Sequence, residues 1–327
     1  MIEQLIQTEV TEFNKDTLKK LKPYFDLSIS YSTPDQRELW FHNLLALAKH
    51  DLSIAHCVHH NHLVRLHIEA KFQNQPPEFY DPVYGNQIGC YSNFKSADSM
   101  TLNGNTLTGT KHWISLVDCS DFGIFRVPVD DTEAYVLIDF AQAKPVVDMS
   151  YTTPIGMQIA RPGSITLDNY NLPKNSILGY RKFYESSPEF FHATQLGDYC
   201  FITNFLGIVI ALYQDLGHYI NDTQINIDYD YKKIGLDVSS LLMTWQDNLA
   251  SLHITTPSDE FWHRRNTQYA QGKNVLLDLI SLILHTCDSR WVDACSPNNQ
   301  RFRDALSFSS HGKPLYKNLE EKYFVKL

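Results

Sequence analysis

Apolar residues recur at helical spacing near the start of the chain. Trp40, Leu44 and Leu47 lie three to four positions apart, and a second apolar run extends over 54–68. This spacing places apolar side chains on one face of a helix, so it predicts a helix over each run. The residues TPDQ at 33–36 give the first helix a capping threonine, a proline at its first position and an acidic first turn.

The pattern changes to short alternating segments between residues 86 and about 180. Residues 100–108 read MTLNGNTLT, and alternation around an Asn-Gly pair is a strong local signal for a β-hairpin. Prolines recur through this region, and they exclude long helices because proline disrupts a helix interior. Further strands are predicted over 122–128, 134–139 and 164–168.

Helical spacing returns from about residue 188. It predicts helices over 191–219, 234–252, 257–290 and 299–308. The order of helices, strands and helices predicts an α+β chain with a β module between two helical ones.

Length, charge and cysteine content narrow the class of protein. A chain of 327 residues suggests about two domains as a starting expectation. The net charge of −9 argues against a nucleic-acid-binding protein, which would carry a basic excess. The longest apolar runs, such as 205–212 and 275–284, are far shorter than the roughly 18–20 residues of a membrane span, and the N-terminus lacks the features of a signal peptide. The six cysteines form no C-x-x-C pair, which is typical of free thiols in a cytoplasmic protein.

Four short motifs follow one another along the chain. They read DLSIA at 51–55, LNGNTLTGTKHWIS at 102–115, DCSD at 118–121 and LPKNSILG at 172–179. In this order they resemble the acyl-CoA dehydrogenase superfamily of flavoproteins. That family has a D-x-S-x-A helix and a middle-domain hairpin with G-x-K-x-W-I-[ST]. A polar turn follows the hairpin, and a V-P-x-x-N-x-L-G segment closes the domain. The resemblance covers most of the chain and implies three domains: an N-terminal helical domain at 1–85, a middle β-barrel or sandwich domain at 86–182 and a C-terminal helical bundle at 183–327.

The resemblance implies a flavin, FAD or FMN, between the β module and the C-terminal helices. In the family the Trp and the hydroxyl residue of W-I-[ST] line the flavin ring, which assigns Trp113, Ile114 and Ser115 to the cofactor site. An indole supplies a flat apolar wall, and a hydroxyl or backbone donor suits the polar edge of the ring. Ser92 stands where the threonine of the family's T-E-P-x-x-G-S-D segment stands. The alternative interpretation makes Trp113 a core aromatic of the β module.

Motifs that hold the flavin phosphates in this family are missing. Residues 229–235 lack the arginine of R-x-x-F-G, and residues 298–300 lack the glycine pair of Q-x-x-G-G. Diphosphate binding needs cations or helix N-termini. Lys232 and Lys233 are candidates for that role, with a solvated helix face as the alternative.

The C-terminal motif leaves two reactions open. Residues 303–312 read RDALSFSSHG, and His311 stands where the dehydrogenases carry their catalytic glutamate. A histidine follows a similar motif in the flavin-dependent monooxygenase branch, and its pKa near neutrality suits proton transfer. The resemblance therefore implies either an oxidoreductase acting on an acyl thioester such as acyl-CoA, with Glu185 or Asp198 as a relocated base, or a monooxygenase assisted by His311. A degenerate member without flavin, acting as a binding or partner subunit, is the third possibility.

Six histidines lie between residues 50 and 67. His56 and His60 are four apart, and His59 and His62 are three apart, a spacing that can hold a metal on one helix face. No H-E-x-x-H pattern accompanies them, so packing and polar contacts are the predicted role and no metal site is predicted.

The family resemblance also implies how the chain associates. We expect a small-molecule substrate, no nucleic acid and no membrane, and a homodimer or homotetramer formed through the C-terminal helices. The apolar residues at 201–216 and 275–284 are the predicted contributors to the subunit contact.

Overall fold

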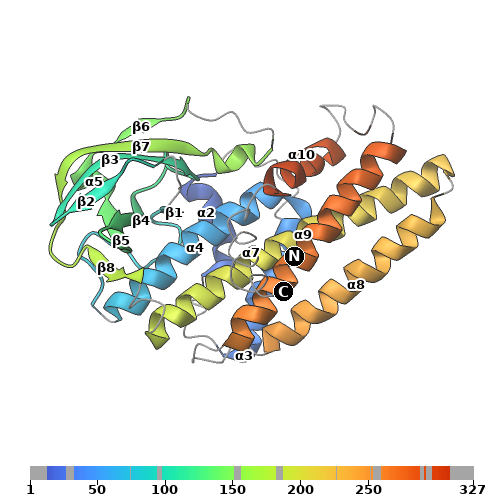
Figure 1. The fold of residues 1–327 in the computed structure, drawn as a ribbon, viewed down its shortest axis with the longest axis horizontal. Coiled ribbons are helices and arrows are strands. Elements are labelled where there is room, and N and C mark those ends of the chain that lie inside the picture. Colours follow the sequence, from blue (N-terminus) through green and yellow to red (C-terminus); the bar gives the residue numbers. More distant parts are fainter. Residues whose placement is uncertain are drawn as a thin grey trace.

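A computed structural model describes the chain over 13–26, 33–73, 75–93, 98–150, 156–181, 187–225, 227–250, 252, 259–287, 291 and 297–309. Within these ranges helices come first, strands second and helices again last, so the predicted α+β class is confirmed. The strands gather at one end of the molecule, and the long C-terminal helices extend from it toward the other end (Figure 1). The ranges of the three implied domains stay a prediction.

Local sequence signals account for the N-terminal helices. These are α2 (Lys15–Phe25), α3 (Pro34–His50) and α4 (Leu52–Phe72). The Thr33 hydroxyl accepts from the backbone N–H of Gln36, whose side chain accepts in turn from the N–H of Thr33, so the predicted cap of α3 is a capping box. Asp51 ends α3 and also caps α4 by accepting from the N–H of Ile54. The two helices are therefore joined without an intervening loop.

The strands form two four-stranded sheets. The first has the order β1-β4-β5-β8, with β1 (Gly89–Ser92), β4 (Phe122–Val129), β5 (Thr132–Asp139) and β8 (Ile177–Tyr180). The second has the order β2-β3-β7-β6, with β2 (Thr101–Asn103), β3 (Thr106–Ile114), β7 (Gly163–Asn171) and β6 (Val146–Asp148). The predicted hairpin joins β2 and β3 through a two-residue turn, in which Gly104 has φ +58°. Glycine suits this turn because it adopts positive φ without steric cost.

Side chains of the first sheet point alternately into two different hydrophobic cores. Phe125 and Val136 face the second sheet and pack into the core between the sheets. Their neighbours Ile124 and Leu137 face the other way and pack against Val64 and further residues of α4. Because successive strand residues point to opposite faces, one sheet binds both the second sheet and α4. The strand layer therefore holds α4 in place from one side.

The C-terminal helices are α7 (Pro188–Thr223), α8 (Asp228–Ala250), α9 (Asp259–Thr286) and α10 (Pro297–Ser309). Helix α7 packs against α3, α4 and α9, and Gly207 lets it approach α3 closely, since a Cβ there would lie 2.4 Å from the Cβ of Ala48. By length and composition α7 could cross a membrane, which the shorter apolar runs did not indicate. Of its most apolar window, 78% is buried inside the protein, as in a core helix.

Candidate functional site

A β-bulge near the end of β3 determines which way Trp113 points. The pairing partner of Lys111 on β7 is Ile165, whereas the partner of Ile114 is Gly163, so β3 has one extra residue in this stretch. Strict alternation would place Trp113 on the same buried face as Lys111. Instead Trp113 adopts φ +56° and is 47% exposed, while Ile114 is fully buried. The bulge thus turns the indole out of the core, a common way to aim a side chain at a functional site.

Two residues after this indole, Ser115 meets a histidine from α4. Its hydroxyl Oγ lies 3.4 Å from Nε2 of His56, and both side chains are buried. Either atom can be the donor, according to the tautomer of the imidazole. The contact joins residues 59 positions apart in the sequence. It brings the W-I-[ST] motif and the helix that begins with the D-x-S-x-A motif into one site.

Helix α4 is unusual because its buried faces carry histidines. His56, His59, His62 and His67 are each no more than 4% exposed. Burial disfavours the charged imidazole, and it lowers the pKa of His59 to about 4 and the pKa values of His62 and His67 to about 3. The imidazoles of these three residues are therefore neutral near pH 7. Neutral rings can accept protons or bind metals through a ring nitrogen.

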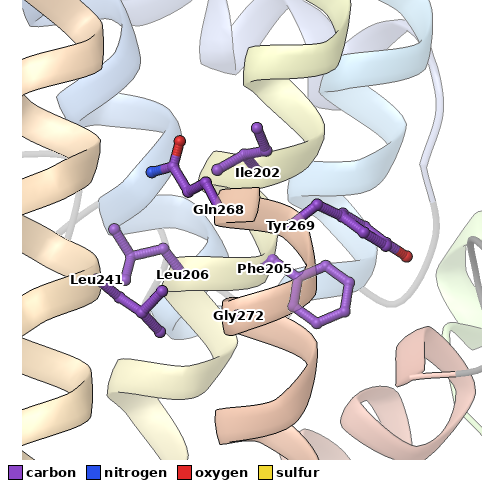
Figure 2. A pocket seen from close by; sticks show the side chains of 7 residues that line it. All are labelled: Ile202, Phe205, Leu206, Leu241, Gln268, Tyr269 and Gly272. Atoms are coloured by element: carbon purple, nitrogen blue, oxygen red, sulfur yellow. The ribbon is translucent and has the colours of Figure 1, made fainter. Parts of the chain in front are cut away.

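Aromatic rings cover the side of His56 that faces the C-terminal helices. The ring of Phe308 on α10 lies 6.0 Å from that of His56, and Phe308 packs on Phe201 and Phe205 of α7 at 4.9 Å each. Tyr269 of α9 continues this cluster. Beyond it lies a small apolar pocket of about 10 Å³, room for roughly one water molecule (Figure 2). The pocket is lined by Ile202, Phe205, Leu206, Leu241, Gln268, Tyr269 and Gly272.

The segment 156–161 connects the elements that carry this site. The N–H of Leu116, next to Ser115, donates to the carbonyl of Ala160 at 2.8 Å. The N–H of Ala160 donates to the Ser53 hydroxyl at 3.0 Å, one helical turn before His56. Within the same segment, the N–H groups of residues 156 and 157 donate to Ser307 Oγ and Asp304 Oδ1 on α10. A single loop thus positions the end of β3, the start of α4 and α10.

Asp304 is the titratable side chain among the groups that bind segment 156–161. It is 2% exposed, and burial raises the pKa of its carboxyl to about 7; the N–H of Met157 opposes the shift, and nearby Asp51 adds to it. Gly156 is required beside it, because a Cβ there would lie 2.2 Å from the Arg303 carbonyl oxygen. Residues of the R-D-A motif therefore hold α10 against the loop.

The other predicted site residues are placed as follows. Ile114 lies in the core between the sheets, so any contact it makes with a cofactor would come from its backbone. Ser92 lies at the end of β1 in the other sheet, and its hydroxyl donates to the carbonyl of Asn93 at 3.2 Å. His311 and Glu185 lie outside the described residues. Asp198, the other alternative base, accepts from Arg265 Nη2 at 2.9 Å.

Sequence reasoning missed His56 as a partner of Ser115. The cluster of six histidines signalled something unusual, but spacing alone does not show which one faces the β module. The two lysines proposed for phosphate binding, Lys232 and Lys233, are exposed near the start of α8. This helix lies away from the sheets in Figure 1.

Comparison with known proteins shows which solved structures have a similar fold. No family model matches the sequence, and no match is found among the curated proteins. Among solved structures, dibenzothiophene monooxygenase from Paenibacillus sp. A11-2 has 15% identity and a TM-score of 0.73, over 99% of this chain and 94% of that one. The 3-HSA hydroxylase from Rhodococcus sp. RHA1 has 12% identity and a TM-score of 0.74, over 100% and 95%. Butyryl-CoA dehydrogenase from Megasphaera elsdenii has 11% identity and a TM-score of 0.73, over 95% and 92%.

These structures match 95–100% of the chain, although few residues are identical. The motifs around Trp113 and Ser115 predicted this fold from the sequence, and the predicted fold is confirmed. The chain has the fold of the acyl-CoA dehydrogenase superfamily, which includes a monooxygenase branch.

Proposed function

We propose that this protein is a flavin-dependent oxidoreductase that acts on a small molecule and uses FAD or FMN. The observation that carries the proposal is the arrangement at the end of β3. There an exposed Trp113 is followed by Ser115, whose buried hydroxyl lies 3.4 Å from Nε2 of His56. A flat apolar surface beside a buried polar pair is what a planar, polar-edged ring system requires.

The residues present suit the ring of a flavin. Trp113 offers the indole as a wall, and Ser115 offers a hydroxyl at its edge. When bound, a flavin supplies hydride acceptance or the activation of oxygen. Two of the similar solved structures contain FMN: the dibenzothiophene monooxygenase and KijD3, the latter together with a dTDP-sugar. The phosphate-binding motifs remain unrecognised, so the choice between FAD and FMN is left to direct binding measurements.

The chain's own residues provide proton handling and exclude water. His56 and Ser115 share a hydrogen-bond contact, so a proton given up or taken by one can be compensated by the other. Phe308 and Tyr269 close the far side of the site with apolar rings, which strengthens polar interactions inside it. His311, by resemblance, is a further candidate for this proton transfer.

We favour monooxygenase-type chemistry over acyl-CoA dehydrogenation. Dehydrogenation of a thioester needs a carboxylate to take the α-proton, and Asp198 is held by Arg265. The groups gathered around Ser115 are imidazoles instead. An imidazole can exchange a proton with an oxygen species or a substrate hydroxyl, whereas the dehydrogenases of this fold use a carboxylate to take a carbon-bound proton.

The first experiment measures flavin binding. Purified protein is titrated with FAD and with FMN, and both colour and thermal stability are followed, since a ligand that binds only the native state raises stability. We expect one of the two to bind. Absence of binding by both would overturn the proposal and leave the flavin-free partner subunit as the remaining hypothesis.

The second experiment separates the reactions. Flavin-loaded protein is mixed anaerobically with a panel of acyl-CoA thioesters, and flavin bleaching is followed. We expect no bleaching, but oxygen consumption when the flavin is reduced, with that oxygen consumption lowered in Ser115→Ala and His56→Gln. Rapid bleaching by a saturated thioester would favour the dehydrogenase.

We also propose that the protein assembles as a homodimer or homotetramer in the cytoplasm. The apolar residues predicted at 201–216 largely face the chain's own core, so α7 contributes little to such a contact. Helix α9 instead exposes Leu277 and Leu284, and α8 exposes Leu236 and Met243. The five described cysteines are free thiols, which suits a reducing compartment.

A further inference from the structure

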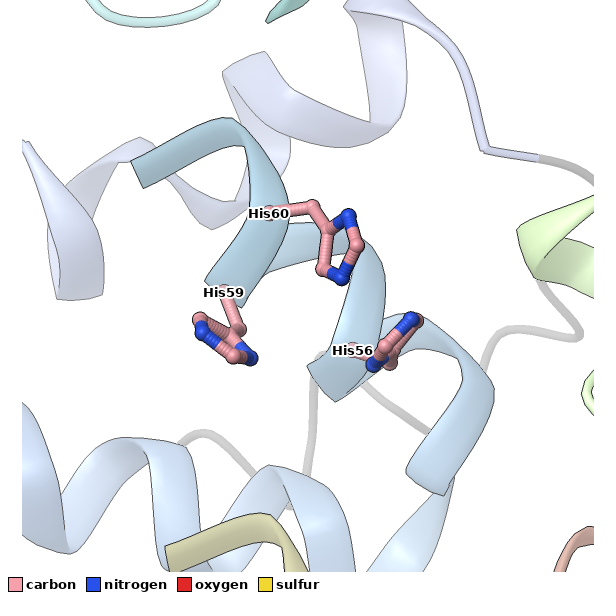
Figure 3. A group of neighbouring side chains, drawn as sticks. All are labelled: His56, His59 and His60. Atoms are coloured by element: carbon pink, nitrogen blue, oxygen red, sulfur yellow. The ribbon is translucent and has the colours of Figure 1, made fainter. Parts of the chain in front are cut away.

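We propose that His56, His59 and His60 bind one divalent transition-metal ion of the zinc class. The three side chains project from neighbouring positions of α4 (Figure 3). One ring nitrogen from each lies within 4.8 Å of those of the other two. The inference goes beyond the proposed flavin chemistry and does not depend on it, although His56 belongs to both sites.

The spacing of the three residues explains their convergence. His56 precedes His59 by three positions and His60 by four, and residues at these separations are neighbours on a helix surface. The rings of His56 and His60 are 4.1 Å apart between centroids, and the ring of His59 lies 6.0 Å and 5.4 Å from them. Two nitrogens on one tetrahedral zinc ion lie roughly 3.3 Å apart, given Zn–N bonds of about 2.0–2.1 Å. Small rotations of the rings would reach that geometry.

His59 supplies the independent observation. It is only 4% exposed, and apart from the backbone of Gly197 its ring nitrogens have no hydrogen-bond partner. Burying such a group without a partner costs free energy, which a bound ion would recover.

The three imidazole nitrogens determine which class of metal ion the site can bind. Three imidazoles and no carboxylate make up the cluster. Magnesium and calcium prefer oxygen ligands, whereas zinc, copper, nickel and cobalt accept imidazole nitrogen. The contact of His56 with Ser115 Oγ resembles the outer hydrogen bond that commonly orients a metal-binding histidine.

Titration of the metal-free, flavin-free full chain with Zn²⁺ tests the site, and Co²⁺ gives a visible absorption band as an independent readout. We expect one ion per chain. His59→Gln and His60→Gln should each weaken binding at least tenfold. His62→Gln is the matched control, since His62 is equally buried on the same helix but outside the cluster, and it should leave the affinity unchanged.

Several results would overturn the site. These are no saturable binding, unchanged affinity in both ligand variants, or equal weakening in His62→Gln. His60 is half-buried, so His60→Gln keeps the test valid if His59→Gln fails to fold. Flavin binding is measured separately on the metal-free protein. Failure of the metal site and failure of the flavin proposal are therefore distinguishable.

Discussion

Replacing Asp304 with asparagine should change how the stability of this protein depends on pH. Its carboxyl is buried, and burial raises its pKa to about 7, against about 3.9 in an unfolded chain. The native state therefore binds the proton more tightly than the unfolded state does. The free energy of unfolding contributed by this group consequently falls as the pH rises from about 4 to about 7.

The size of the effect follows from these two pKa values. Between pH of about 5.5 and about 8, ionisation of Asp304 lowers the free energy of unfolding by about 2 kcal/mol. Asparagine has no charge to bury, and its carbonyl oxygen can still accept from the N–H of Met157. Asp304→Asn should thus gain about 2 kcal/mol relative to the wild type on going from the lower to the higher pH.

Urea unfolding followed by tryptophan fluorescence at both pH values measures this change. Asp168→Asn on the exposed side of β7 is the matched control and should follow the wild type. The buried imidazoles of His59, His62 and His67 act in the opposite direction, because their pKa values are lowered. Their contribution is common to all three proteins and cancels in the comparison. An equal difference between Asp304→Asn and the wild type at both pH values would refute the reasoning.

Three further results are expected. Trp113→Ala should weaken flavin binding by roughly 1–3 kcal/mol, or about 5- to 150-fold, with little change in thermal stability because the indole is exposed; a large loss of stability would instead indicate a core role. Ser53→Ala removes the hydroxyl that accepts from the Ala160 N–H, so the free energy of unfolding should fall by about 1 kcal/mol; urea denaturation measures this, and an unchanged value would contradict the role of segment 156–161. Light scattering at micromolar concentration should report a dimer or tetramer, and a monomer mass would contradict the assembly.

Much of the fold could be predicted because its signals are local. The capping residues at 33–36 and the two-residue turn of Gly104 and Asn105 act through neighbouring backbone groups, so they have the same effect in any tertiary context. The motif around Trp113 went further and predicted the fold of the superfamily. It also named Trp113 and Ser115 as candidates for the site.

The exposure and contacts of the side chains at the site depend on tertiary packing. Alternation along β3 cannot reveal the bulge that exposes Trp113 and buries Ile114, because the bulge arises from pairing with β7. Nor can helical spacing show that His56 meets Ser115, which lies 59 positions away. The sequence by itself determined the elements, their order and the family resemblance, since periodicity and turn chemistry are short-range. Only the tertiary structure decided which histidines are buried and what they face, because burial and long-range contacts exist only once the sheet and α7 enclose α4.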